Sequence, residues 1–219
     1  MNIIQTRPVY GRNYRLGYLG FEFKTADPIA EGIAWFTRQD RESAVKVAHV
    51  FIVSGPDECI EAHAGSGVIR ASLEGRLADP CTIVCFKKPA GWSLDLGARI
   101  VAAAEPRIGE GYDGSLIVAH ALNGSFLGRL VSHLTGDEIA SKLVDLLDTQ
   151  DEWICSELGA YVLNEQVEFA GVGVLSKPNA SITPQELFDC DELFEPWKDK
   201  LPDRSLLYEP AKAGSKDGV

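Results

Sequence analysis

A cysteine stands near the start of a predicted helix in the stretch DEWICSELGAYVL, residues 151–163. Asp151 is a suitable N-cap residue, which places Cys155 within or just past the first turn. Unpaired backbone amides and the helix macrodipole favour a thiolate there. Gly159 lies four residues later on the same helix face, and we expect a strand to approach the helix closely at this point. The pattern indicates a nucleophilic cysteine, provided that the chain also supplies a base.

A β-hairpin predicted upstream carries a histidine and a carboxylate. Residues 45–53 alternate and are β-branched, residues 54–58 have turn chemistry, and residues 59–65 form a second strand. This hairpin places His49 on its first strand and Glu61 on its second.

The register of the hairpin decides whether these two side chains meet. With a turn centred near Gly55 or Pro56, His49 faces Glu61 directly across the two strands. A slip of one residue would bring Ala62 opposite His49 instead. The first register predicts a base next to a carboxylate that orients it.

These three residues together suggest nucleophilic catalysis. The thiolate of Cys155 would attack a carbonyl, the imidazole of His49 would transfer the proton, and Glu61 would fix the tautomer of the ring. The amide of Cys155 would meet part of the oxyanion at the helix start. A thioacyl-enzyme would then pass its acyl group to water or to another acceptor.

Structural roles for the same residues remain open. Free cysteine is among the most buried residue types, so Cys155 could simply pack in the core. Glu61 could lie on a solvated face, and His63 competes for the role of base. His120 and His133 lie in a helical region and are expected to be structural or on the surface.

Composition narrows the class of protein. The chain has 219 residues and a net charge of −11, which favours one domain over residues 1–210 and disfavours nucleic-acid binding. We expect a disordered tail over residues 211–219. No apolar run is long enough to span a membrane, and no signal peptide is visible at the N-terminus, so we expect a cytoplasmic protein.

The cysteines are expected to be reduced. Their number, five, is odd, and no secretion signal precedes them. Cys81 and Cys85 are four residues apart, but no second Cys or His pair follows at the spacing of a zinc site. No metal and no cofactor is therefore predicted, and the oligomeric state stays open.

The remaining patterns predict an α+β fold, an antiparallel sheet packed by helices. The first twenty residues indicate irregular or edge structure. Further strands are predicted over residues 67–73, 81–88 and 169–176. Further helices are predicted over residues 27–38, 93–105, 115–131 and 135–148, with a last one capped by Thr183.

The order of several motifs resembles the circularly permuted papain-like amidases, the YiiX-like branch of the NlpC-type cysteine peptidases. The motifs are AHVFIV, CIEAHAGSGV, GYDGS, WICSELGAYVL and ITPQELF, and they extend over roughly residues 20–190. In that branch the histidine precedes the cysteine. The resemblance implies a single permuted papain-like domain.

The resemblance also implies roles for individual residues. Cys155 matches the nucleophile, His49 the base and Glu61 the orienting residue, while Tyr112 matches a tyrosine that hydrogen-bonds substrate or oxyanion. Members are similar to amidases and peptidases that act on short peptides or amino-acid amides, and related branches act on lipid acyl chains. The implied partner is therefore a small peptide, an amino-acid amide or an acyl substrate.

Departures from the family pattern leave other functions open. Ala48 stands where the family often has Ser or Asp, and FEFKTADP replaces a usual glycine–aspartate pair. The apolar segment 115–131 could line an acyl groove, as a thiol acyltransferase or lipid thioesterase would need. A binding or structural module that has kept the fold without activity is the third possibility.

Overall fold

The computed structural model describes residues 8–24, 46–63, 65–79, 81–111, 153–195 and 207–208. These residues form an antiparallel sheet with the strand order β4-β3-β2-β1-β5-β6. The strands are β1 (Leu19–Lys24), β2 (His49–Gly55), β3 (Glu58–His63), β4 (Gly67–Ser72), β5 (Thr82–Lys87) and the two-residue β6 (Leu207–Tyr208). The predicted α+β class with an antiparallel sheet is confirmed.

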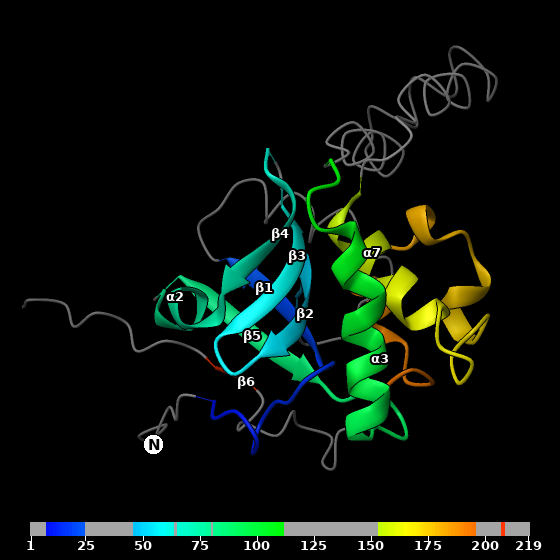
Figure 1. Cartoon of the computed structure of the whole chain (residues 1–219), viewed down its shortest axis with the longest axis horizontal. Coiled ribbons are helices and arrows are strands. Elements are labelled where there is room, and N and C mark those ends of the chain that lie inside the picture. The colour runs from blue at the N-terminus through cyan, green and yellow to red at the C-terminus, as the bar shows by residue number, and fades with distance from the viewer. Residues whose placement is uncertain are drawn as a thin grey trace, which may run out of the picture.

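Helices cover both faces of the sheet, with α2 on one side and α3 and α7 on the other (Figure 1). The bounds are α2 (Leu73–Ala78), α3 (Leu94–Ala104), α7 (Cys155–Asn164) and α8 (Pro184–Asp189), with 3-10 turns η1 (Glu105–Arg107), η2 (Gly173–Ser176) and η3 (Asn179–Ser181).

Alternation along β2 divides the core into two parts. Val50 and Ile52 pack with α3, α7 and α8, whereas Phe51 and Val53 pack with α2. Successive side chains of a strand point to opposite faces, so a sheet with both faces covered is apolar throughout.

The register of the β2–β3 hairpin differs from the predicted one. The turn lies at Pro56 and Asp57, the register shifts between Val53 and Gly55, and Ile52 then pairs with Ile60. The predicted direct pairing of His49 with Glu61 was therefore wrong. The difference is two residues, however, and a two-residue shift leaves both side chains on the same face as diagonal neighbours.

Two predicted helix caps, at Ser93 and Thr183, are confirmed. Ser93 caps α3 by accepting a hydrogen bond from Leu96 N (3.1 Å). Thr183 caps α8, Pro184 is the first helical residue, and Glu186 closes the capping box, as predicted. Each signal lies within four residues of the helix start, so the distant chain did not alter it.

Three other segments correct the prediction. Residues 169–176 form turns and η2 rather than a strand, because Gly171 and Gly173 have positive φ (71° and 53°). Of the first twenty residues, predicted as irregular or edge structure, residues 8–18 form turns and isolated bridges, whereas Leu19 and Gly20 begin β1, which pairs with both β2 and β5. The connection after β4 contains α2.

Some predicted segments lie outside the described residues. They are the helices over 27–38, 115–131 and 135–148, and the tail 211–219. None of the helices in the described ranges is long and apolar enough to cross a membrane.

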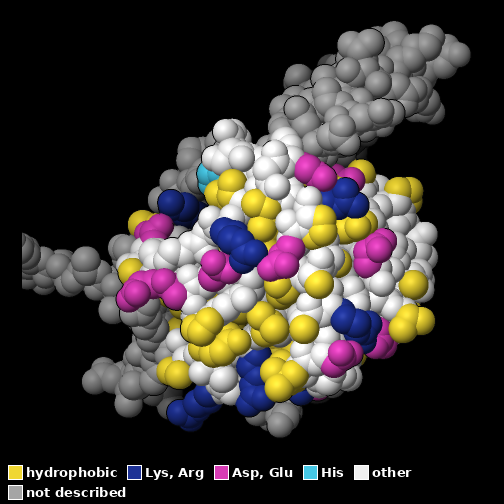
Figure 2. All heavy atoms as spheres, in the orientation of Figure 1, with side chains coloured by type: hydrophobic (Ala, Val, Ile, Leu, Met, Phe, Trp, Pro, Cys, Tyr) yellow, Lys and Arg dark blue, Asp and Glu magenta, His cyan; other side chains and the backbone are white. Residues whose placement is uncertain are grey.

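Acidic and basic side chains are interspersed on the face in Figure 2 rather than gathered by sign. Two arginines each bond two carboxylates. Arg70 contacts Glu58 and Glu105, and Arg99 contacts Asp95 and Glu168. Exposed pairs of this kind contribute little to stability, and they neutralise charge locally.

Replacement of Gly20 by alanine should destabilise the protein. A Cβ atom at Gly20 would lie 2.0 Å from the ring of Phe51, which is fully buried. We expect a loss of about 1–3 kcal/mol in the free energy of unfolding, measured by urea denaturation, because an overpacked core must shift.

Gly75→Ala is the matched control. Gly75 lies in α2, and a Cβ atom there would meet nothing within 4 Å. Alanine should stabilise this position by about 0.5–1 kcal/mol. Equal effects of the two substitutions would contradict the close packing of β1 against β2.

Candidate active site

The helix α7 begins at Cys155 itself, so this cysteine occupies the first helical position. The N-cap is Ile154, and its N–H donates to Glu157 Oε2 at 3.5 Å. The predicted N-cap, Asp151, lies outside the described residues and before the observed start. Cys155 is therefore closer to the unpaired amides of the helix than the sequence suggested.

The approach of a strand to Gly159 holds α7 in place. A Cβ atom at Gly159 would lie 3.0 Å from Val50 Cγ1 and 3.2 Å from Leu187 Cδ2. The predicted close approach beside Cys155 is confirmed, and the strand is β2, which also carries His49. The glycine lets the helix lie against the sheet at the point where the nucleophile and base must meet.

His49 lies between Glu61 and Cys155. Its Nε2 atom bonds Glu61 Oε2 in a short contact, and its ring also hydrogen-bonds the thiol of Cys155. Because Nε2 is engaged with the carboxylate, Nδ1 is the nitrogen that faces the sulfur. The structure thus brings together all three residues that the sequence singled out.

This contact forms at the end of the sheet rather than on one face. Alternation puts His49 on the side of Phe51 and α2, whereas α7 packs on the side of Val50. The sulfur also accepts hydrogen bonds from the backbone at Val50 and Ser156. Residues at the first position of β2 and the first position of α7 therefore meet where both elements begin.

Electrostatics favour an ion pair between sulfur and ring. Burial lowers the pKa of His49, but Cys155 and Glu61 outweigh it and raise the pKa to about 10. Burial raises the pKa of the Cys155 thiol, but His49 and the backbone hydrogen bonds outweigh it, so this pKa is lowered. Both shifts favour a thiolate–imidazolium ion pair over the neutral thiol and imidazole.

The other sequence candidates are placed differently. His63 is exposed at the last position of β3, where it pairs with Gly67. Tyr112, His120 and His133 lie outside the described residues, so the predicted role of Tyr112 remains a prediction.

None of the five cysteines forms a disulfide in the structure. Cys81 is exposed and Cys85 is buried in the core beside α3 and α7. Within the described ranges, no group of three or more His, Cys, Asp and Glu residues is arranged to hold a metal ion.

Sequence reasoning missed two residues that contact this site. Arg76, in α2, donates from Nη2 to both oxygens of Glu61 at 2.6 Å each, and its Nη1 contacts Glu22 of β1. The available signal was a charged residue between the apolar positions Leu73 and Leu77 of a short helix, which indicates partial burial. No pattern in the neighbouring sequence indicated that Glu61 and Glu22 would be the partners of Arg76.

Comparison with known proteins supports the fold alone. No protein-family model and no curated protein matches this sequence. The structure is similar to the crystal structure of the metalloprotein YiiX from Escherichia coli O157:H7, with a TM-score of 0.51 and 16% sequence identity. The similarity covers 83% of this chain and 95% of that one. The chain therefore has a YiiX-like α+β fold.

Proposed function

We propose that this protein is a cysteine hydrolase that cleaves an amide or peptide bond through Cys155, His49 and Glu61. The observation that supports this function is the position of His49, bonded to the carboxylate on one side and to the sulfur on the other. Few structural roles require a buried carboxylate, an imidazole and a helix-start thiol in one chain of hydrogen bonds.

The first half of the reaction forms a thioester. The Cys155 thiolate attacks the carbonyl carbon, and the oxyanion is met in part by the amide of Cys155 at the start of α7. His49 donates its Nδ1 proton to the leaving amine, which breaks the C–N bond. The ring is left neutral, with its Nε2–H still directed at Glu61.

The second half releases the acid and restores the enzyme. A water molecule attacks the thioester carbonyl while Nδ1 of His49 takes its proton. Collapse of the tetrahedral intermediate breaks the C–S bond and returns the thiolate next to the imidazolium. Glu61 keeps the ring oriented through its bond to Nε2.

We also propose that the fold is the circularly permuted papain-like one. The chain order of His49, Glu61 and Cys155 matches the order of the permuted branch, and the YiiX-like fold agrees with it. Of the four residues that match the branch, Cys155, His49 and Glu61 lie in contact, and Tyr112 is outside the described residues.

A metal-dependent reaction does not fit these side chains, although the YiiX structure is described as that of a metalloprotein. Both oxygens of Glu61 already accept hydrogen bonds from Arg76, and Oε2 also bonds His49. A cation bound at this carboxylate would face the buried guanidinium at short range. No step of the proposed reaction uses a metal.

The identity of the acyl group remains part of the test. The apolar segment 115–131, which suggested a thiol acyltransferase or lipid thioesterase, lies outside the described residues, and no described contact favours either. A small peptide, an amino-acid amide or an acyl ester would all form the same thioester, so the probes must distinguish them.

Cys155 should be alkylated by iodoacetamide at mildly acidic pH faster than Cys81. Cys155 is only 6% exposed and Cys81 is exposed, so access alone favours Cys81. The lowered pKa of Cys155 keeps its thiolate present below the ordinary thiol pKa of about 8.5. Peptide mass spectrometry measures both rates in one sample.

His49→Ala is the variant that checks the cause. Without the imidazolium the pKa of Cys155 should rise, and Cys155 should then react more slowly than Cys81. Faster labelling of Cys81 in the unaltered protein would contradict the proposed function.

In a panel of peptide-amide, aminoacyl-amide and acyl-ester probes, the preferred probe should acylate Cys155 in the unaltered protein. Intact-mass measurement detects the adduct, and the rate of probe hydrolysis gives the turnover. Cys155→Ala should abolish the adduct. His49→Ala should reduce turnover by about 100-fold or more, because general acid–base catalysis is lost.

Two further variants complete this experiment. Glu61→Gln should lower turnover while leaving Cys155 in place, because a neutral amide replaces the negatively charged carboxylate that orients the His49 ring. Cys81→Ala, which removes the exposed thiol, should act like the unaltered protein. Full activity of Cys155→Ala on every probe would leave a non-catalytic module as the better description.

A further inference from the structure

Arg76 lies between the carboxylates of Glu61 on β3 and Glu22 on β1, the two strands that flank β2. Its side chain is 12% exposed, Glu61 is 2% exposed, and Glu22 is 14% exposed. Its Cζ atom lies 4.7 Å from the centre of the Phe51 ring. The guanidinium therefore contacts β1, β2 and β3 at once, directly behind the carboxylate that His49 bonds.

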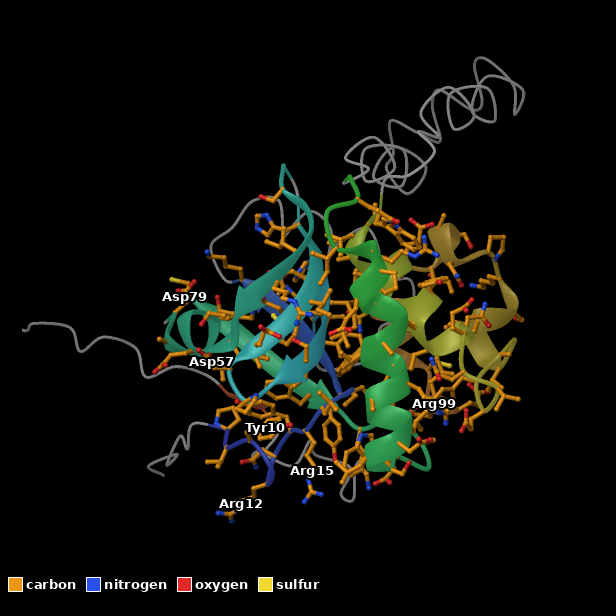
Figure 3. The ribbon with its side chains drawn as sticks, in the orientation of Figure 1. Tyr10, Arg12, Arg15, Asp57, Asp79 and Arg99 are labelled. Carbon is orange, nitrogen blue, oxygen red and sulfur yellow. The ribbon has the colours of Figure 1, made fainter. Side chains whose placement is uncertain are left out.

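The short helix that carries Arg76 is anchored at both ends, and Figure 3 shows the two anchoring aspartates, Asp57 and Asp79, flanking it. Asp57 accepts a hydrogen bond from the N–H of Glu74 at the start of α2. Asp79 follows the helix, where it pairs with Lys24 at 3.3 Å. These anchors hold α2 against the sheet and fix the base of the Arg76 side chain.

Five charges meet in this buried region. The ion pair of Cys155 and His49 adds no net charge, and Glu61 and Arg76 also cancel, which leaves the negative charge of Glu22. Cys59 of β3 and the tyrosines Tyr14 and Tyr18 are also buried on this face. Burial raises the pKa of Cys59 and the pKa of Tyr18, so neither adds a charge at neutral pH. Glu74, also on α2, is exposed. Arg76 is the charge that balances the two carboxylates.

We propose that Arg76 is a positioning residue, which holds Glu61 against His49 and which, together with Glu22, sets the pH at which Cys155 becomes nucleophilic. This inference rests on the proposed function, because it assumes that Cys155 is the nucleophile. It adds two residues, one on α2 and one on β1, to the three that touch one another.

Removal of the Arg76 charge and removal of the Glu22 charge should shift the pH at which the Cys155 thiolate forms in opposite directions. Without the guanidinium, the region gains negative potential and the thiolate forms only at higher pH. Without the Glu22 carboxylate, the region loses negative potential and the thiolate forms at lower pH. A purely structural role would loosen the site in both variants and would not reverse the sign.

The experiment measures the rate of Cys155 alkylation by iodoacetamide as a function of pH in the full chain. For Arg76→Met, the midpoint of the acid limb should rise by about one pH unit, and for Glu22→Gln it should fall by about one pH unit, as expected for single charges at this range. The double variant should return the midpoint close to that of the unaltered protein.

Two controls separate charge from folding. Arg99→Met removes an arginine that also bonds two carboxylates but is exposed on α3, away from α2 (Figure 3), so its midpoint should not move. Arg76→Lys keeps the charge and should keep the midpoint. If Arg76→Met does not fold, the fall expected for Glu22→Gln and the unchanged midpoint expected for Arg76→Lys still test the proposal.

The outcomes distinguish this inference from the proposed function. Opposite shifts with recovery in the double variant support the role of Arg76. Shifts of the same sign, or none, in a protein whose Cys155 is highly reactive would overturn the role of Arg76 alone. An ordinary thiol at Cys155 in the unaltered protein would overturn both.

Discussion

The buried carboxylate of Glu61 is the group around which the site is built. A carboxylate that is 2% exposed has lost nearly all of its hydration, which is costly unless cations and hydrogen bonds replace the water. His49 and Arg76 supply both. The strands and the short helix that carry these partners must therefore keep their relative positions for both contacts to form.

This constraint explains why both sides of the sheet take part. Arg76 reaches the carboxylate from α2, and Cys155 reaches the imidazole from α7 on the other side. Gly159 allows α7 to approach Val50 closely, and Gly20 leaves room for the ring of Phe51 beneath Arg76. The site forms where β2 and α7 begin. At this point the side chain of His49 contacts both Glu61 of the sheet and Cys155 of α7.

Local sequence patterns predicted much of the fold and also the contact between His49 and Glu61. The contact of His49 with Glu61 was predicted from alternation, and it survived an error of two residues in register because parity preserves the face. The error came from the position of the turn, which lies at Pro56 and Asp57, and the register shift between Val53 and Gly55 reduces the offset from three residues to two. The strand predicted over 169–176 failed because Gly171 and Gly173 adopt positive φ, which a β-branched pattern does not reveal.

The sequence alone determined the features that depend on near neighbours: the strands from alternation, the caps of α3 and α8, and a thiol at a helix start that a glycine follows. Only the tertiary structure decided which distant groups meet, namely Cys155 with His49 across more than a hundred residues, and Arg76 with Glu22 and Glu61. The physical reason is that a spacing of two or four residues specifies a face, whereas a charge pair between elements depends on how those elements pack.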